Sequence, residues 1–133
     1  SYGDIISEIM TEKILEKNLK DQVITYVPMH RKKEGERGYN QSKILAEKIA
    51  RNLDLPCQDV FEKVIDTKFQ VGLKKFDREE NLRDAFEVKN YAEEIIIVDD
   101  VITTGATISE LTKIAKKAGI KKVTALIAAT EIA

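Results

Sequence analysis

The sequence predicts an α/β fold in which helices flank a parallel sheet, and two observations lead to this prediction. The first is a short run of branched apolar residues at 95–98, which suits a strand buried on both faces. The second is the helical periodicity that follows Gly105, where apolar residues recur every three or four positions until Gly119 ends the helix. A buried strand, a tight polar loop and a helix form the repeating unit of such sheets.

Length and composition limit the range of functions. The chain has 133 residues, of which 43% are hydrophobic and 34% charged, so we expect one domain over residues 1–133 with a real core. The net charge of −1 creates no general attraction to nucleic acid or to a membrane. Cys57 is the one cysteine, which excludes an intrachain disulfide and favours a small buried residue over a nucleophile. No apolar run reaches membrane-spanning length and no signal peptide is visible, so we expect a cytoplasmic protein.

The first half of the chain predicts two helices around one strand. Residues 4–19 form an amphipathic helix whose apolar residues lie near one face: Ile5, Ile6, Ile9, Met10, Ile14, Leu15 and Leu19. A strand at 23–27 is ended by Pro28. A second helix is capped by Asn40 or Ser42 and runs to about Leu53. Its inward residues are Ile44, Leu45, Ile49 and Leu53.

The second half predicts three further strand regions and a long basic loop. Residues 57–65 form a strand region whose register is open, and residues 86–88 form a short strand. Between them, residues 66–84 are too long and too aperiodic for an ordinary connection. This loop is either a mobile basic flap that covers a ligand or a basic surface excursion, and composition favours neither. The buried strand at 95–98 and its helix follow, and a final strand at 122–129 closes the sheet.

The loop after the buried strand combines groups that suit a phosphorylated sugar. Unpaired N–H groups at the helix start suit a phosphate, and Gly105 lets the backbone approach it closely. The hydroxyls of Thr103, Thr104 and Thr107 add donors. Asp99 and Asp100 are poor partners for a phosphate but accept hydrogen bonds from sugar hydroxyls, or they hold a cation.

Three other interpretations fit the residues of this loop less well. The plainest is a strand that ends in two solvated acids before a threonine N-cap, since such caps are common. An NTPase is disfavoured because the loop lacks the lysine of the GxxxxGK[ST] motif. A receiver domain needs a phosphoacceptor aspartate on a later strand, and no aspartate follows Asp100.

The loop after the first strand is the second candidate region. It contains Met29, His30 and Arg31 and is rich in cations through to Arg37. A charge run is usually a solvated surface, but in a parallel sheet this loop would share an edge with the Asp99–Asp100 loop. A pyrophosphate needs cations and N–H donors. His30 is either a phosphate or solvent donor or, less simply, a general base.

The stretch from residue 95 to Thr107 resembles the signature of the type I phosphoribosyltransferases, which bind phosphoribosyl pyrophosphate (PRPP) and share a Rossmann-like fold. The resemblance implies that Asp99 and Asp100 are the catalytic residues and hold the ribose 2′- and 3′-hydroxyls. It implies that the 5′-phosphate is held by Thr103, Thr104, Gly105, Ala106 and Thr107. The pyrophosphate would lie on Met29, His30 and Arg31, with the basic loops contributing Arg37, Lys74 and Arg78. Mg²⁺ would enter with PRPP, and Asp99 and Asp100 are its candidate protein ligands.

A second set of landmarks resembles the ComF family of competence-related proteins and covers about residues 26–130. It consists of 27–31, 37–41, Gln70 with Gly72 and Leu73, Arg78, Asn81, Ala85 with Phe86, and 99–107. The resemblance implies a phosphoribosyltransferase-like domain linked to DNA uptake, with proteins of the competence machinery as partners. Two departures are Phe69, where the family has proline, and the absence of the cysteine-rich, zinc-binding N-terminal module. The chain begins at Ser1, near the point where that module would end, as a truncated or a naturally short form.

The function that we expect is transfer of the phosphoribosyl group from PRPP to an unidentified nitrogen acceptor, with release of pyrophosphate. The rival is a non-catalytic module that senses PRPP or binds a protein, because little of the chain remains to form a hood over an acceptor. A DNA-binding accessory role is weak, since the basic residues have no stacking aromatics beside them. A homodimer is among the assemblies that the resemblance allows.

Overall fold

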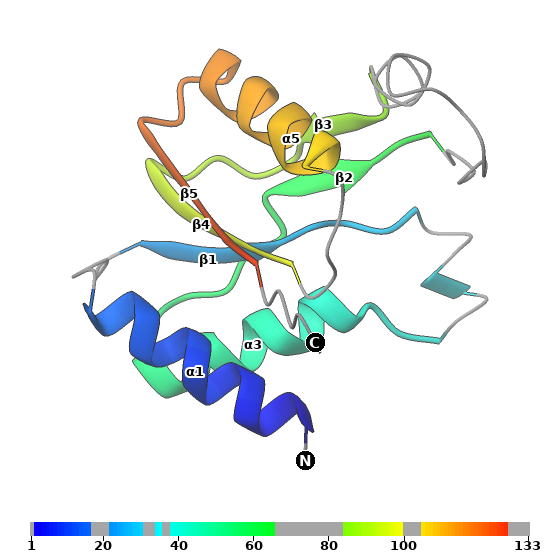
Figure 1. Cartoon of the computed structure of the whole chain (residues 1–133). Helices are drawn as coiled ribbons and strands as arrows, with labels where there is room; N and C mark the ends of the chain where they lie inside the picture. Colours follow the sequence, from blue (N-terminus) through cyan, green and yellow to red (C-terminus); the bar gives the residue numbers. More distant parts are fainter. Residues whose placement is uncertain are drawn as a thin grey trace.

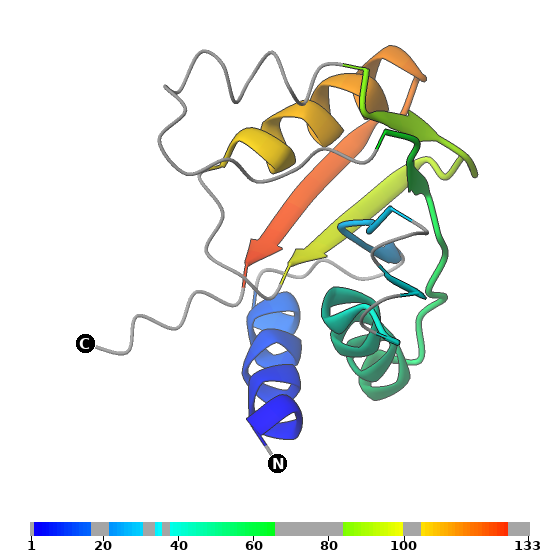
Figure 2. The same ribbon diagram turned by 90° about the vertical axis from the view of Figure 1, so that its right-hand side faces the viewer.

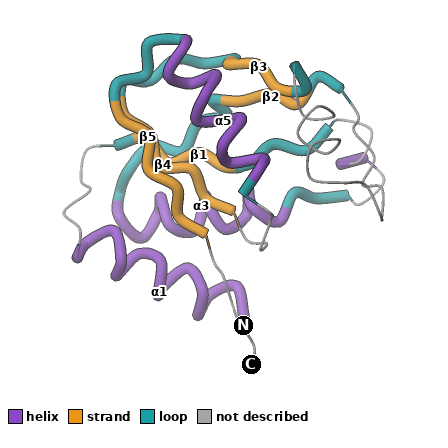
Figure 3. Tube along the Cα trace, turned by 45° about the horizontal axis from the view of Figure 1, so that its top comes forward, coloured by secondary structure: helices purple, strands orange, loops and turns teal. Residues whose placement is uncertain are grey.

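The computed structural model describes residues 2–16, 22–30, 34–35, 38–65, 84–99 and 105–127. Helices lie on both sides of a central sheet (Figure 1). Helices α1 (Tyr2–Glu16) and α3 (Gln41–Leu53) cover one face, and α5 (Ala106–Lys117) covers the other (Figure 3). The helices and strands are therefore arranged in the layers that the sequence predicts.

The sheet consists of β1 (Val23–Tyr26), β4 (Glu94–Asp99) and β5 (Lys122–Ile127), in the order β1-β4-β5. Both pairings are parallel: Ile24 lies opposite Ile96, and Ile96 lies opposite Thr124. A parallel bridge between Ile24 and Cys57 extends the sheet beyond β1, through hydrogen bonds of 2.9 Å and 3.0 Å that flank Cys57. The parallel sheet expected from the sequence is confirmed, and the central strand β4 is its most apolar member because both of its faces are covered.

A separate antiparallel pair is formed by β2 (Phe61–Lys63) and β3 (Phe86–Val88). This pair lies on the α5 side of the sheet (Figure 1). The predicted strand region at 57–65 thus divides into a parallel bridge at Cys57 and the short strand β2. The reason is that Phe61 packs with the α5-side core, whereas Cys57 packs with the core of the opposite face.

Two hydrophobic clusters hold the layers together, one on each face of the sheet. Ile96 and Val98 face α1 and α3, while Ile95 and Ile97 face α5 and the β2–β3 pair. The alternation follows from the two-residue period of a strand. These four side chains are fully buried, so β4 contributes to both clusters and connects them.

The sequence predicts one apolar face on the first helix, and this prediction is wrong for three of the residues assigned to that face. Ile6, Met10 and Ile14 are buried, at a spacing of four residues. Ile5, Ile9 and Leu15 are 57%, 49% and 50% exposed, because they flank the narrow stripe that reaches the sheet. Ile44 on α3 was also expected to point inward but is 40% exposed, while Leu45 and Ile49 are buried as predicted.

Candidate functional site

Strands β1 and β4 end side by side, and this sets the position of the site. Tyr26 lies opposite Val98, and the Val27 N–H donates to the Val98 carbonyl at 3.2 Å. The segments that follow the two strands therefore leave from the same edge of the sheet, as parallel pairing requires. Viewed from the side, the carboxyl ends of β4 and β5 also lie at one edge (Figure 2). The predicted juxtaposition of the two loop starts is confirmed.

Helix α5 begins at this edge with a glycine. Gly105 is the N-cap residue, with φ 82° and ψ −14°, a left-handed conformation that glycine adopts without steric cost. It has no side chain that accepts a hydrogen bond from the helix start, unlike the serine, threonine or aspartate that usually stands there. A Cβ atom built on Gly105 would meet no other atom within 4 Å. The N–H groups of the first turn, from Ala106 and Thr107 onward, are thus left by helix geometry for a partner outside the helix.

Asp99, the last residue of β4, points to the start of α3. It is 3% exposed, and its Oδ1 atom accepts a hydrogen bond from the Ser42 hydroxyl at 3.2 Å. Ser42 is itself 5% exposed. The first of the two predicted acids is therefore an oriented, buried carboxylate and not a solvated strand end, which argues against the plainest alternative for this loop.

Asn40 joins the start of α3 to the end of β1. Its Oδ1 atom accepts from the Lys43 N–H at 3.2 Å, which makes Asn40 the N-cap. Its Nδ2 atom donates to the Val27 carbonyl at 3.3 Å. The predicted choice between Asn40 and Ser42 as cap is resolved in favour of Asn40, and this leaves the Ser42 hydroxyl to reach Asp99.

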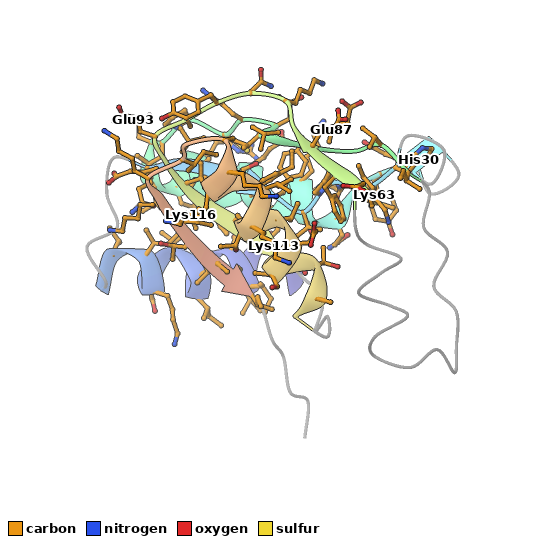
Figure 4. The ribbon with its side chains drawn as sticks, turned by 90° about the horizontal axis from the view of Figure 1, so that it is seen from above. His30, Lys63, Glu87, Glu93, Lys113 and Lys116 are labelled. Carbon is orange, nitrogen blue, oxygen red and sulfur yellow. The ribbon has the colours of Figure 1, made fainter. Side chains whose placement is uncertain are left out.

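Met29 and His30 follow β1 at the same edge and are both half-buried. The His30 carbonyl accepts from the Glu34 N–H at 3.0 Å, which turns the chain after the strand. His30 lies at the same end of the molecule as Lys63, opposite the end that carries Glu93 (Figure 4). Lys63 was not predicted as a site residue, because a single lysine in a short strand has no signal of its own.

A cavity of about 440 Å³ adjoins the end of β1 on the side of β2. Its lining residues are Tyr26, Pro28, Met29, Glu34, Asn40, Lys43, Asp59, Phe61, Glu62, Lys63 and Lys89. Of the predicted site residues that the structure describes, Met29 lines it, whereas His30 and Asp99 do not. The cavity therefore adjoins Met29 of the predicted pyrophosphate loop, and Asp99 does not contribute to its lining.

Burial and nearby charged side chains shift the pKa values of three groups at or near this cavity, namely Tyr26, Asp59 and Cys57. Burial raises the pKa of Tyr26 to about 12, and the carboxylate of Asp59 adds to the effect. The hydrogen bond from Lys89, whose Nζ lies 3.0 Å from the Asp59 Oδ2, lowers the pKa of the Asp59 carboxyl group. Burial likewise raises the pKa of the Cys57 thiol to about 11, which makes the thiol a poor nucleophile at neutral pH. The side chain is half-buried, and not fully buried as the sequence predicts.

Several predicted residues lie outside the described part of the chain. These are Asp100, Thr103, Thr104, Arg31, Arg37, Lys74 and Arg78, and with them nearly all of the loop at 66–84. Within the described ranges, no three His, Cys, Asp or Glu residues are grouped so that they could hold a metal ion. The described helices include none that is long and apolar enough to cross a membrane.

The sequence relatives of the chain include competence proteins and DNA utilization proteins, among them the DNA utilization protein YhgH of Escherichia coli at 34% identity over 106 residues. The chain is 35% identical over 108 residues to competence protein F of Haemophilus influenzae, a match that covers 77% of this chain and 47% of that protein. It is 36% identical over 93 residues to competence protein ComFC of Bacillus subtilis, covering 67% of this chain and 36% of that protein. The chain thus spans less than half the length of these relatives. No protein-family model matches the chain.

The structural relatives share the fold. An allosteric regulatory enzyme of purine biosynthesis superposes with a TM-score of 0.62 at 18% identity, over 98% of this chain and 27% of that one. A hypoxanthine phosphoribosyltransferase from Staphylococcus aureus superposes with a TM-score of 0.56 at 12% identity, over 94% of this chain and 62% of that one. At such low identities the likeness concerns the fold alone.

Proposed function

We propose a function for a chain that is a homologue of the ComF competence proteins and has the phosphoribosyltransferase fold: it binds PRPP and transfers the phosphoribosyl group to a nitrogen acceptor. The observation that carries the proposal is the opening of α5. Helix α5 starts at Gly105, an N-cap residue with no side chain of its own to cap the first turn. It begins at the sheet edge where β4 ends in Asp99 and where the loop after β1 begins. Donors for a phosphate and acceptors for a diol thus meet at one edge.

Each part of PRPP has a candidate partner. The N–H groups at the start of α5 would hold the 5′-phosphate, with the hydroxyls of Thr103, Thr104 and Thr107 as further donors. Asp99 and Asp100 would accept hydrogen bonds from the ribose diol. Met29, His30 and Arg31 would hold the pyrophosphate, together with the basic residues Arg37, Lys74 and Arg78.

Magnesium would reach the site with the substrate. The described residues include no cluster of three metal ligands, and magnesium commonly keeps substrate phosphates as ligands instead of requiring a cage of protein side chains. Asp99 and Asp100 supply the carboxylate oxygens that the ion prefers. When bound, the ion would spread the negative charge that develops on the leaving pyrophosphate.

The protein's share of the reaction is positioning and electrostatics. The bond from ribose C1 to the pyrophosphate oxygen breaks and its electron pair leaves with pyrophosphate. A bond from C1 to the acceptor nitrogen forms, and the proton that this nitrogen loses passes to solvent. Residues at the 5′-phosphate and at the diol hold the ribose at both ends while C1 becomes positively charged. Carboxylates beside the ribose favour that charge, and basic residues favour the leaving group.

The relatives' names supply a biological context. We propose that the domain is part of a protein of bacterial competence, as two relatives are by name, and that its binding of PRPP serves DNA uptake. Turnover separates a transferase from a sensor: release of pyrophosphate in a screen of amines and bases supports the enzyme. Saturable PRPP binding that persists without pyrophosphate release from any acceptor supports the sensor instead.

The test of the binding step compares two glycines. Gly105→Val should abolish PRPP binding, because its side chain would enter the space into which the ligand approaches. Gly119→Val is the matched control, since Gly119 also has a left-handed φ of 91° and open space at its Cβ, but lies at the other end of α5. Both variants should lose about 1–2 kcal/mol of stability through backbone strain. Titration calorimetry with PRPP and magnesium should detect binding by the control variant alone; unchanged affinity in Gly105→Val would contradict the proposal.

A second test concerns the sugar. The double variant Asp99→Asn with Asp100→Asn should weaken PRPP binding far more than binding of inorganic phosphate, because phosphate makes no diol contact. Calorimetric titrations with both ligands measure the difference. Equal losses for the two ligands would remove the basis for assigning these acids to the ribose.

A further inference from the structure

We propose that Ser42 is a positioning residue that orients the Asp99 carboxylate toward the ribose diol. This inference rests on the proposed function and deepens it, because it assigns a role to a residue outside the loops predicted to touch PRPP. The contact that carries it is the hydrogen bond from the Ser42 hydroxyl to the Asp99 Oδ1 atom, at 3.2 Å. It joins residues 57 positions apart in the sequence.

The burial of this pair indicates more than a packing role. Ser42 and Asp99 are only 5% and 3% exposed. A carboxylate taken out of water is costly unless it is hydrogen-bonded, and an apolar residue would pack at the strand end at lower cost. A buried acid held by a hydroxyl donor is therefore best explained by a role of its carboxylate oxygens in binding a ligand.

The start of α3 is suited to hold the acid in a fixed position. The helix cap is supplied by Asn40, which accepts from the Lys43 N–H and donates to the Val27 carbonyl. Ser42 follows in the first turn, and the helix is anchored behind it by buried residues such as Leu45 and Ile49. The first turn of α3 thus contacts both the end of β1, through Val27, and the end of β4, through Asp99. It sets the separation between the proposed pyrophosphate loop and the proposed diol acid.

The primary experiment measures PRPP and inorganic phosphate affinities of Ser42→Ala by calorimetry. We expect PRPP binding to weaken about tenfold, as loss of a hydrogen bond to a charged group predicts, while phosphate affinity stays unchanged. Ser42→Thr keeps the hydroxyl and should restore most of the PRPP affinity. The matched control is Ser7→Ala, because Ser7 is also buried in a helix, and its hydroxyl donates to the Asp4 carbonyl at 2.8 Å, remote from this edge. It should leave both affinities unchanged.

Two further measurements separate positioning from general damage. In a double-mutant cycle with Asp99→Asn, the losses in PRPP affinity should be non-additive, because the hydroxyl acts through the carboxylate. In an NMR titration, the Asp99 carboxyl carbon should titrate at higher pH in Ser42→Ala, since the donor that favours the charged form is lost while the acid remains buried.

The outcomes distinguish the two proposals. If the wild-type chain binds PRPP and Ser42→Ala binds it equally well, the positioning role is overturned and the proposed function stands. Equal losses of PRPP and phosphate affinity in Ser42→Ala would also overturn it, because they indicate damage to the whole edge. If the wild-type chain does not bind PRPP, the proposed function fails. The orienting role toward the ribose diol then fails with it, and the NMR titration tests only the contact between Ser42 and Asp99, which an unchanged Asp99 titration would contradict.

Discussion

Tyr26 and Cys57 show how burial acts on single residues near the site. Both are half-buried, and both are neutral when protonated, so removal from water disfavours their charged forms. The pKa of Cys57 rises from 9.0 to about 11, and that of Tyr26 from 10.0 to about 12. In both cases burial is the main cause, followed by the charge of Glu47 on Cys57 and of Asp59 on Tyr26. The Cys57 thiol is therefore protonated at neutral pH.

The raised pKa values predict a loss of stability in alkali. Below pH 9 both groups are protonated in the folded and unfolded states, so their contribution to the free energy of unfolding is fully present. As pH rises toward 11 for Cys57 and 12 for Tyr26, the unfolded chain releases protons first, and the free energy of unfolding falls. Tyr26→Phe should remove the part of this loss above pH 10, whereas Tyr39→Phe, at a half-exposed ring, should not. Urea unfolding between pH 8 and pH 12 measures both, and identical alkaline profiles in wild type and Tyr26→Phe would contradict the assignment.

At the scale of the element, α1 and α3 differ in how much of their apolar surface they bury. In α3 a continuous buried stripe includes Leu45 and Ile49, and the cap at Asn40 fixes its start. In α1 the buried residues form a single narrow line, and the apolar residues beside it remain half exposed. Apolar content alone therefore overestimates how much of α1 packs against the sheet, because the width of the contact is set by the surface that it meets.

This difference predicts unequal costs of truncation within α1. Ile14→Ala should lower the free energy of unfolding by about 2–5 kcal/mol, because it leaves a cavity at a fully buried position. Ile9→Ala, at a residue 49% exposed on the same helix, is the matched control and should cost about 0.5 kcal/mol. Chemical denaturation gives both values. Comparable losses in the two variants would show that α1 packs differently from this structure.

A cap prediction belongs to α3. Asn40→Ala should cost about 1–2 kcal/mol, because the Lys43 N–H and the Val27 carbonyl both lose a partner. Asn40→Asp keeps the acceptor for the Lys43 N–H and loses the donor to Val27, so its stability should lie between wild type and Asn40→Ala. Thermal unfolding of the three proteins checks the order. If Asn40→Asp were as unstable as Asn40→Ala, the hydrogen bond from the Lys43 N–H to the side chain of residue 40 would contribute less than the bond to the Val27 carbonyl.

At the scale of the whole molecule, PRPP would connect segments that are distant in the sequence. The end of β1 at Tyr26 is far in the sequence from the end of β4 at Asp99 and the start of α5 at Gly105, and all three meet at one sheet edge. A ligand that binds only the folded chain stabilises it by an amount that grows with the logarithm of the ligand concentration divided by Kd. The effect should therefore be visible in global unfolding.

We expect PRPP with magnesium, at about one hundred times its dissociation constant, to add about 2.7 kcal/mol of stability. For a domain of this size that corresponds to a rise in Tm of roughly 10 °C. Inorganic pyrophosphate should give a smaller rise at the same concentration, because it lacks the ribose and the 5′-phosphate. Scanning calorimetry makes the comparison, and equal rises for the two ligands would indicate that only the pyrophosphate loop binds.

The sequence by itself determined the architecture and the order of the site residues along the chain. The apolar run of β4, the glycines at both ends of α5 and the two candidate caps before α3, Asn40 and Ser42, are local signals, and each was enough to predict its element. Only the tertiary structure decided which side of α1 is buried, which residue caps α3 and which partner Asp99 has. These depend on contacts between residues far apart in the chain, and Ser42 and Asp99 carry no local pattern that reports their meeting across 57 positions.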